Sequence, residues 1–80
     1  MIDRQKIMNR LTPICRIVFQ LPNLELTDSL DATQVDTWTS LSFMHLLTKV
    51  EEEFGFRFKM IELLEIHNIG TLIDVIETHC

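Results

Sequence analysis

The stretch that decides the fold begins at Trp38-Thr39-Ser40-Leu41-Ser42 and ends at Glu51-Glu52-Glu53-Phe54-Gly55-Phe56. Between these points the apolar residues recur at steps of three, one, three and four: Phe43, Leu46, Leu47, Val50 and Phe54. This spacing predicts an amphipathic helix over about Ser40 to Phe54 with one buried face. Thr39 can cap its start, since a hydroxyl accepts a hydrogen bond from a first-turn amide, and Gly55 is a typical residue just past a helix end.

The residues before this stretch predict a first amphipathic helix over residues 3 to 19. Its apolar positions at helical spacing are Ile7, Leu11, Ile14, Cys15 and Val18. Pro13 has no amide proton for the carbonyl of Asn9, so the helix should bend there. Alternatively, Thr12-Pro13 is a cap followed by a first helical residue and splits the segment in two.

Residues 20 to 38 form a long connection that we expect to be ordered and draped over the core. Apolar residues recur through it and require burial: Leu21, Leu24, Leu26, Leu30 and Val35. Asp31 followed by Gln34 is a variant of the capping-box pattern and predicts a short turn of helix over 32 to 36.

The last third of the chain predicts a short helix around Lys59 to Ile66 and a final helix over Leu72 to His79 capped by Thr71. There are no repeats, low-complexity tracts or linkers, and 80 residues permit one small domain. We therefore expect residues 1–80 to form a single all-α domain, a four-helix bundle with a minor third helix.

Composition excludes several classes of protein. An apolar fraction of 46% is ordinary for a globular chain and argues against disorder. No apolar run approaches the roughly 20 residues needed to cross a bilayer, and the first residues do not resemble a signal peptide. We expect a cytoplasmic protein.

Charge is unevenly distributed along the chain. Residues 1 to 18 carry a net charge of +3, and residues 19 to 80 carry −8. An acidic body disfavours nucleic-acid binding, which requires a basic footprint, and favours basic protein partners. The alternative is that these acids are simply a solvated surface.

The cysteines and histidines do not form a metal-binding pattern. Cys15 lies on the apolar stripe of the first helix, Cys80 is the last residue, and His45, His67 and His79 are widely spaced. We expect no metal site and no disulfide framework.

Ser40 and His45 are close in sequence but do not make a nucleophile and base. On a helix, residues five apart point about 140° away from each other. No orienting acid or oxyanion arrangement accompanies the pair. We therefore expect no catalytic residues.

From about Val18 to His79 the chain resembles acyl carrier proteins, most closely a stand-alone branch whose attachment sequence reads Trp-Asp-Ser-Leu. Three stretches carry the resemblance: 30 to 42 around Ser40, Glu51 to Phe58 with its Glu-Glu-x-Phe-Gly-x-x-Phe pattern, and 69 to 77 in the last helix. The chain departs from the family at Thr39, where the family has an aspartate immediately before the serine.

The resemblance implies that a phosphopantetheinyl transferase joins 4′-phosphopantetheine to the Ser40 hydroxyl. The thiol of this arm would then carry an acyl or aminoacyl group as a thioester for partner enzymes, and the protein itself would make no bond. A hydroxyl at a helix start suits this role, since the amide end of a helix stabilises a nearby phosphate. Taken alone, without the resemblance, a serine at a helix start is most often an ordinary early helical residue.

The residues beside Ser40 are candidates for contacts with partner enzymes: Thr39, Leu41, Met44, His45, Lys49, Glu51 and Glu52. Leu41 and Met44 would offer apolar contacts; the alternatives are that Leu41 is partly buried and that Met44 belongs to the core. The two glutamates match family acids that meet basic partners, or else are solvated. His45 and Lys49 replace acidic or neutral residues usual in fatty-acid carriers, which indicates a change of partner.

Three hypotheses for function follow. The first is a discrete carrier for a specialised pathway. The second is an unmodified, carrier-like interaction module in which Thr39 marks loss of transferase recognition. The third is a stand-alone peptidyl carrier of nonribosomal synthesis. Helix periodicity does not identify the cargo, and a monomer is the simplest expectation.

Overall fold

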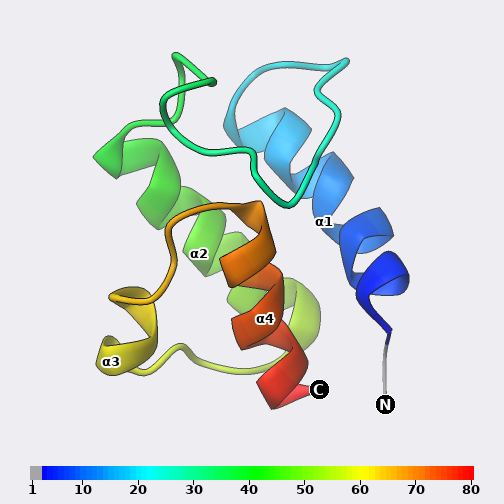
Figure 1. Cartoon of the computed structure of the whole chain (residues 1–80), viewed down its shortest axis with the longest axis vertical. Helices are drawn as coiled ribbons and strands as arrows, with labels where there is room; N and C mark the ends of the chain where they lie inside the picture. Colours follow the sequence, from blue (N-terminus) through cyan, green and yellow to red (C-terminus); the bar gives the residue numbers. More distant parts are fainter. Residues whose placement is uncertain (1–2) are drawn as a thin grey trace.

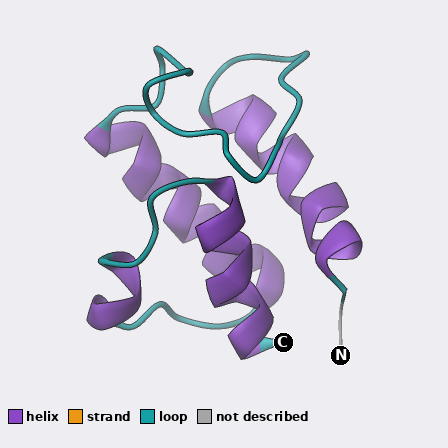
Figure 2. Cartoon of the chain, in the orientation of Figure 1, coloured by secondary structure: helices purple, strands orange, loops and turns teal. Residues whose placement is uncertain are grey.

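Four helices make up the computed structural model, which describes residues 3–80 (Figures 1 and 2). They are α1 (Arg4–Val18), α2 (Ser40–Phe54), α3 (Met60–Leu63) and α4 (Ile69–His79), and the described residues contain no strand. The long helices α1 and α2 are joined by the connection of residues 19–39, which crosses one end of the molecule (Figure 1). The predicted all-helical fold with a short third helix is confirmed.

One core is enclosed by the three longer helices and the long connection. The predicted faces pack into the core, where Ile7, Leu11 and Cys15 of α1 and Leu46, Leu47 and Val50 of α2 are buried. The other predicted positions are only partly buried: Ile14, Val18, Phe43 and Phe54. Burial raises the pKa of the Cys15 thiol to about 12. The connection contributes buried Leu30 and Val35, and its other leucines pack against the core. The prediction of an ordered, draped connection is confirmed.

Helix α1 runs without interruption through Pro13, so the predicted alternative of two separate helices is wrong. The Thr12 hydroxyl donates to the carbonyl of Met8 at 2.8 Å and does not cap a new helix. The helix is capped at its start by Asp3, whose carboxylate accepts from the Lys6 amide at 2.8 Å. The bend at Pro13 stays a prediction.

Helix α1 ends in a Schellman motif that has a glutamine where glycine is usual. The amide of Leu21 donates to the carbonyl of Arg16 at 3.0 Å, and the amide of Gln20 donates to that of Ile17 at 3.2 Å. Gln20 itself has φ 57°, in the left-handed region. A residue with a Cβ is strained there by about 1–2 kcal/mol.

Replacing Gln20 by glycine should therefore stabilise the protein. Relief of the strain exceeds the extra backbone entropy of glycine in the unfolded chain, for a net gain of about 0.5–1 kcal/mol in the free energy of unfolding. Urea unfolding measures it. Gln5→Gly is the control, since Gln5 lies inside α1 and its replacement should cost about 1 kcal/mol. A loss of stability in Gln20→Gly would contradict the account.

The short turn of helix predicted over 32 to 36 is absent, and consecutive turns take its place. The Asp31 carboxylate accepts from the Thr33 amide at 2.9 Å and not from that of Gln34. The Gln34 side chain accepts from the Asp31 amide at 3.2 Å. Only half of a capping box forms, and the Asp31 side chain instead stabilises a turn of its own.

Helix α3 is shorter than the predicted Lys59 to Ile66, and none of its residues is fully buried. It is held by Glu62, whose carboxylate accepts from the Lys59 amide at 2.7 Å and contacts His79 Nε2 at 2.9 Å. The hydrogen bond from the Lys59 amide, aided by His79, lowers the pKa of Glu62. His79 also stacks on Phe56 with ring centres 4.3 Å apart. This cluster joins α3 to the end of α4.

The predicted start of the last helix was wrong by three residues. Asn68, not Thr71, caps α4, since its side chain accepts from the Thr71 amide at 2.8 Å. The Thr71 hydroxyl accepts in return from the Asn68 amide at 3.0 Å. In the first turn, the Gly70 amide donates to the carbonyl of Asp28 at 2.8 Å. A Cβ at Gly70 would lie 2.9 Å from that oxygen, so a glycine is required at this approach of α4 to the connection.

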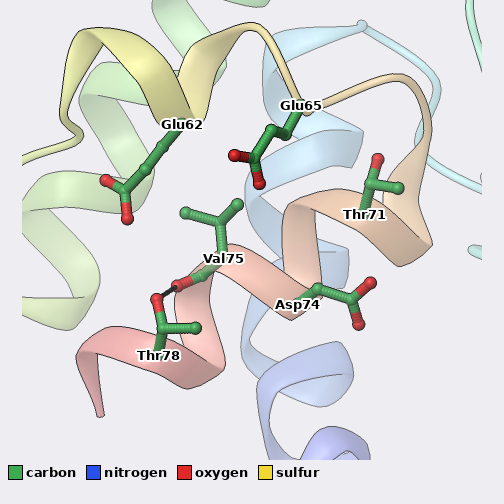
Figure 3. Close-up of a pocket in the computed structure, with 6 residues that line it drawn as sticks. All are labelled: Glu62, Glu65, Thr71, Asp74, Val75 and Thr78. Atoms are coloured by element: carbon green, nitrogen blue, oxygen red, sulfur yellow. Dashed lines mark hydrogen bonds between the residues drawn. The ribbon is translucent and has the colours of Figure 1, made fainter.

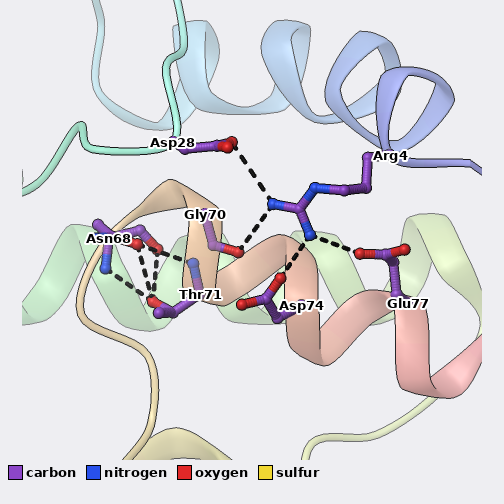
Figure 4. Close-up of polar contacts among 7 residues, drawn as sticks. All are labelled: Arg4, Asp28, Asn68, Gly70, Thr71, Asp74 and Glu77. Carbon is purple, nitrogen blue, oxygen red and sulfur yellow. Dashed lines mark hydrogen bonds and ion pairs between the residues drawn. The ribbon is translucent and has the colours of Figure 1, made fainter.

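The basic first segment is partly neutralised by the acidic body. Arg4 pairs with Asp74 and Glu77 of α4, approaches Asp28 of the connection at 3.6 Å and donates to the carbonyl of Gly70 (Figure 4). The hydrogen bond to Asp74 is the first cause of a raised Arg4 pKa. These groups are substantially exposed, so each pair contributes little to stability. The contacts of Arg4 hold the start of α1 against α4.

Candidate functional site

Ser40 is the first residue of α2 and is exposed. The start of α2 lies at the opposite end of the molecule from the C-terminus (Figure 1). Thr39 caps the helix as predicted, with its hydroxyl accepting from the Ser42 amide at 3.2 Å. A fifteen-residue helix thus presents the Ser40 side chain at its amide end.

Two serines stand near this helix start, and only one has a hydroxyl that is free to react. The Ser42 hydroxyl accepts from the Thr39 amide at 2.8 Å and donates to the carbonyl of Thr37 at 2.6 Å. Among residues 3–80, the Ser40 hydroxyl makes no hydrogen bond. Ser42 is therefore a structural residue. Its role was missed because a capping box usually has glutamate or glutamine at that position.

Aromatic stacking anchors the residues that lead to Ser40. Trp38 stacks on Phe19 at the end of α1, with ring centres 5.1 Å apart, and on Phe43 of α2 at 6.1 Å. Phe19 is fully buried. The backbone just before the serine is thus fixed to both long helices.

The predicted partner residues lie on α2 or directly beside it, and most are exposed. Leu41 and Met44 have 68% and 58% of their surface exposed. The alternative that Met44 is a core residue is therefore wrong, and most of the Leu41 side chain is free for contacts. His45, Lys49 and Glu52 are exposed as well. These residues give α2 an outer face that is apolar near Ser40 and mixed in charge beyond it.

Glu51 differs from the other predicted partner residues because its carboxylate already has a structural partner. It is half-buried and accepts from the Phe58 amide at 2.8 Å. Its backbone carbonyl accepts from Gly55, which has φ 74° and ends α2 as predicted. Glu51 therefore shapes the turn after α2, and its contact with partners stays a prediction.

Two adjoining surface hollows lie beside the start of α2. One, of about 440 Å³, is lined by residues on both sides of Ser40, including Thr39 and Leu41. The other, of about 390 Å³, extends toward Lys49. Both are lined by Val18, Gln20 and His45. The sequence does not predict that Gln20 lines these hollows, because neither its exposure nor its unusual φ affects the spacing of the apolar residues.

A separate hollow of about 160 Å³ lies between α3 and α4 (Figure 3). It is lined by Glu62, Glu65, Thr71, Asp74, Val75 and Thr78. None of these is a predicted site residue. Within residues 3–80 no group of three or more histidine, cysteine or acidic side chains is placed to hold a metal ion.

The fold and site define a class of small helical proteins that present an exposed serine at a helix start. Residues 18–76 match the phosphopantetheine attachment site family. The chain is 28% identical to an acyl carrier protein of Coprothermobacter proteolyticus over 78 residues, which cover 98% of this chain and 95% of that one. The chain therefore belongs to the phosphopantetheine-binding acyl carrier family.

A solved structure agrees with this assignment. The holo acyl carrier protein from Geobacter metallireducens superimposes with a TM-score of 0.83 and 35% sequence identity, over 89% of this chain and 82% of that one. Proteins of this family are carriers and not catalysts, and they work with a transferase and with enzymes that act on the cargo. The prosthetic group is covalent 4′-phosphopantetheine, which supplies a flexible arm ending in a thiol that can hold a thioester.

The residues at the start of α2 fit this group. The Ser40 hydroxyl is exposed and unoccupied by other contacts within the described chain. The amides of Ser40 and Leu41 stand in the first turn, where no carbonyl of the helix can accept from them, so they can bind a phosphate oxygen. No helix among the described residues is long and apolar enough to span a membrane.

Proposed function

We propose that Ser40 carries the phosphopantetheine arm and that the protein moves acyl or aminoacyl thioesters for a specialised biosynthetic pathway. The observation that carries the first part is the unused, exposed hydroxyl of Ser40 beside the fully engaged hydroxyl of Ser42. The expected cytoplasmic location and monomeric state stay predictions.

The mixed charge on α2 supports the specialised pathway. His45 and Lys49 are exposed one turn apart, on a helix where a typical fatty-acid carrier offers acidic or neutral residues. Rim charges exclude wrong partners and change association rates more than they add affinity. A basic enzyme surface that suits an acidic carrier would meet repulsion here.

Steady-state kinetics with a fatty-acid elongation enzyme tests the pathway. The holo protein should give roughly tenfold lower kcat/KM than a genuine fatty-acid carrier, and the double variant His45→Glu/Lys49→Ala should recover much of the loss. The control is His67→Glu/Lys6→Ala, which changes the net charge equally at two exposed sites outside α2. If the wild-type holo protein works as well as the fatty-acid carrier, the specialised-pathway proposal fails.

Thr39→Asp should speed attachment of the arm. The substitution restores the carboxylate that the family has before the serine, and we expect roughly two- to fivefold faster loading by a broad-specificity transferase at low salt, with less gain at high salt. Stability should change little because both side chains can cap α2. Thr39→Asn is the matched neutral control. Equal rates for the Asp and Asn variants at every ionic strength would contradict the account.

A further inference from the structure

We propose that the outer side of α3 is a docking surface for a partner protein that presents an apolar centre with acidic residues at its rim. The surface consists of Met60, Ile61 and Leu64, and we call it the α3 apolar face. These side chains have 79%, 63% and 69% of their surface exposed. The inference does not depend on attachment at Ser40.

The three residues form one patch on a single helical turn. Leu64 directly follows α3 and keeps right-handed helical backbone angles. Residues three or four apart are neighbours on the surface of a helix, so Leu64 adjoins both Met60 and Ile61. The exposed apolar surface is therefore continuous and not a set of scattered side chains.

The acidic side chains of the same turn point the other way. Glu62 and Glu65 line the hollow between α3 and α4, and Leu63 packs against the core (Figure 3). A surface helix usually turns its apolar side to the core and its charged side to water. Here two acids face α4 while three large apolar side chains face solvent, and an exposed apolar patch of this kind is typical of an interaction site.

Glu62 fixes this orientation of α3. Its carboxylate accepts from the Lys59 amide at 2.7 Å and contacts His79 Nε2 at 2.9 Å. Both side chains are half-buried, and His79 is stacked on Phe56. A rotation of α3 that buried its apolar face would break these contacts and bring Glu62 to the surface. The exposure of the α3 apolar face is therefore built into the fold.

Charge beside the α3 apolar face determines the sign of the partner. Arg57 and Lys59 precede Met60 and are exposed, and the ion pairs within residues 3–80 use neither of them. They are two of the three lysines and arginines in residues 19–80, so positive charge is concentrated here. Acidic residues at the rim of a partner would speed association with this face, and a basic rim would be repelled.

A second copy of the chain and a membrane surface fit this face less well. Three side chains bury on the order of a few hundred Å², below the roughly 800 Å² per partner of a stable complex. Two copies of net charge −5 also repel each other. The same charge opposes an anionic bilayer, and helices that lie in a membrane surface are much longer than α3. The face is suited to a transient contact with another protein.

Two designed peptides test the proposal. Both form a soluble amphipathic helix with the same stripe of leucines, and the positions beside the stripe are glutamates in one peptide and lysines in the other. Each is titrated into the isotope-labelled chain, with and without the arm, and amide shifts of residues 57–65 give the affinity at this face. Phosphatidylglycerol vesicles and a dilution series of the protein alone test the membrane and the second copy.

We expect the glutamate peptide to bind at residues 57–65 roughly fivefold more tightly than the lysine peptide at low salt, whether or not the arm is present. Ile61→Ser should weaken this binding roughly fivefold, because it removes the centre of the patch. Ile17→Ser is the matched control, since Ile17 is also largely exposed but lies on α1, and it should leave the affinity unchanged.

The charge arm uses Arg57→Gln/Lys59→Gln, which should remove the preference for the glutamate peptide. Lys6→Gln/Lys49→Gln makes the same change in net charge at two exposed sites outside this segment and should preserve it. Circular dichroism checks that each variant keeps its helices. Equal or weaker binding of the glutamate peptide at residues 57–65 overturns the proposal. Larger shifts there with vesicles, or with rising protein concentration, would assign the face to a membrane or to a second copy instead.

Discussion

Ser40→Ala should abolish attachment of phosphopantetheine while leaving the fold intact. Wild-type protein incubated with coenzyme A and a broad-specificity transferase should gain the mass of one arm, and the variant should gain none. The loss should be complete because the reacting oxygen itself is removed. Alanine is well tolerated in a first helical turn, so the circular dichroism spectrum and the unfolding midpoint should change little.

Ser42→Ala is the matched control because it removes the other hydroxyl of the same turn. Its hydroxyl bonds the Thr39 amide and the Thr37 carbonyl, so its loss should cost about 1 kcal/mol of stability. The variant should still accept the arm. Peptide mass spectrometry that places the arm on Ser42 or Ser29 of the wild type, or a wild type that no transferase modifies, would refute the assignment.

The sequence predicts α2 to the residue because both of its ends have strong local signals. Thr39 can accept from a first-turn amide and Gly55 can adopt a positive φ at low cost, and both do so. The apolar spacing between them is typical of a helix with one buried face. For α2, the capping residues and the packing of the helix against the core therefore favour the same boundaries.

The start of α4 was mispredicted because two residues three positions apart have the same capping chemistry. Asn68 and Thr71 are both good caps, and Gly70 between them is a poor helix former. The choice depends on a tertiary contact, the hydrogen bond of the Gly70 amide to Asp28, which lies forty-two residues earlier in the chain. Apolar spacing within α4 carries no information on that contact.

The two adjoining hollows beside the start of α2 could not be predicted for a related reason. Ile17 and Gln20 are exposed residues at the end of α1, and they approach His45 only because α1 packs against α2. The strain at Gln20 appears only in its backbone angle. Ser40 and its neighbours on α2 could be proposed from the sequence because they are contiguous in it, whereas the hollows are lined by residues from both helices.

Phe19→Ala should bring the protein close to unfolding. Phe19 is fully buried and stacks on Trp38, so its truncation should cost about 3–5 kcal/mol through lost contacts and the cavity left behind. A domain of this size has a total stability of about 4–12 kcal/mol. Urea unfolding measures the loss. Ile17→Ala is the control, since Ile17 is on the same turn of α1 but largely exposed, and its replacement should change stability by about 0.5 kcal/mol or less.

Phe19→Leu keeps the test informative if the alanine variant does not fold. It should cost about 1–1.5 kcal/mol and leave the helices intact. Trp38 is the only tryptophan in the sequence, so its fluorescence reports on the stack, and emission should shift to the red as the indole becomes wetter. Because Trp38 fixes the backbone before Ser40, the same variant should also be loaded more slowly by a transferase. Unchanged fluorescence with a normal loading rate would show that the stack does not position the attachment serine.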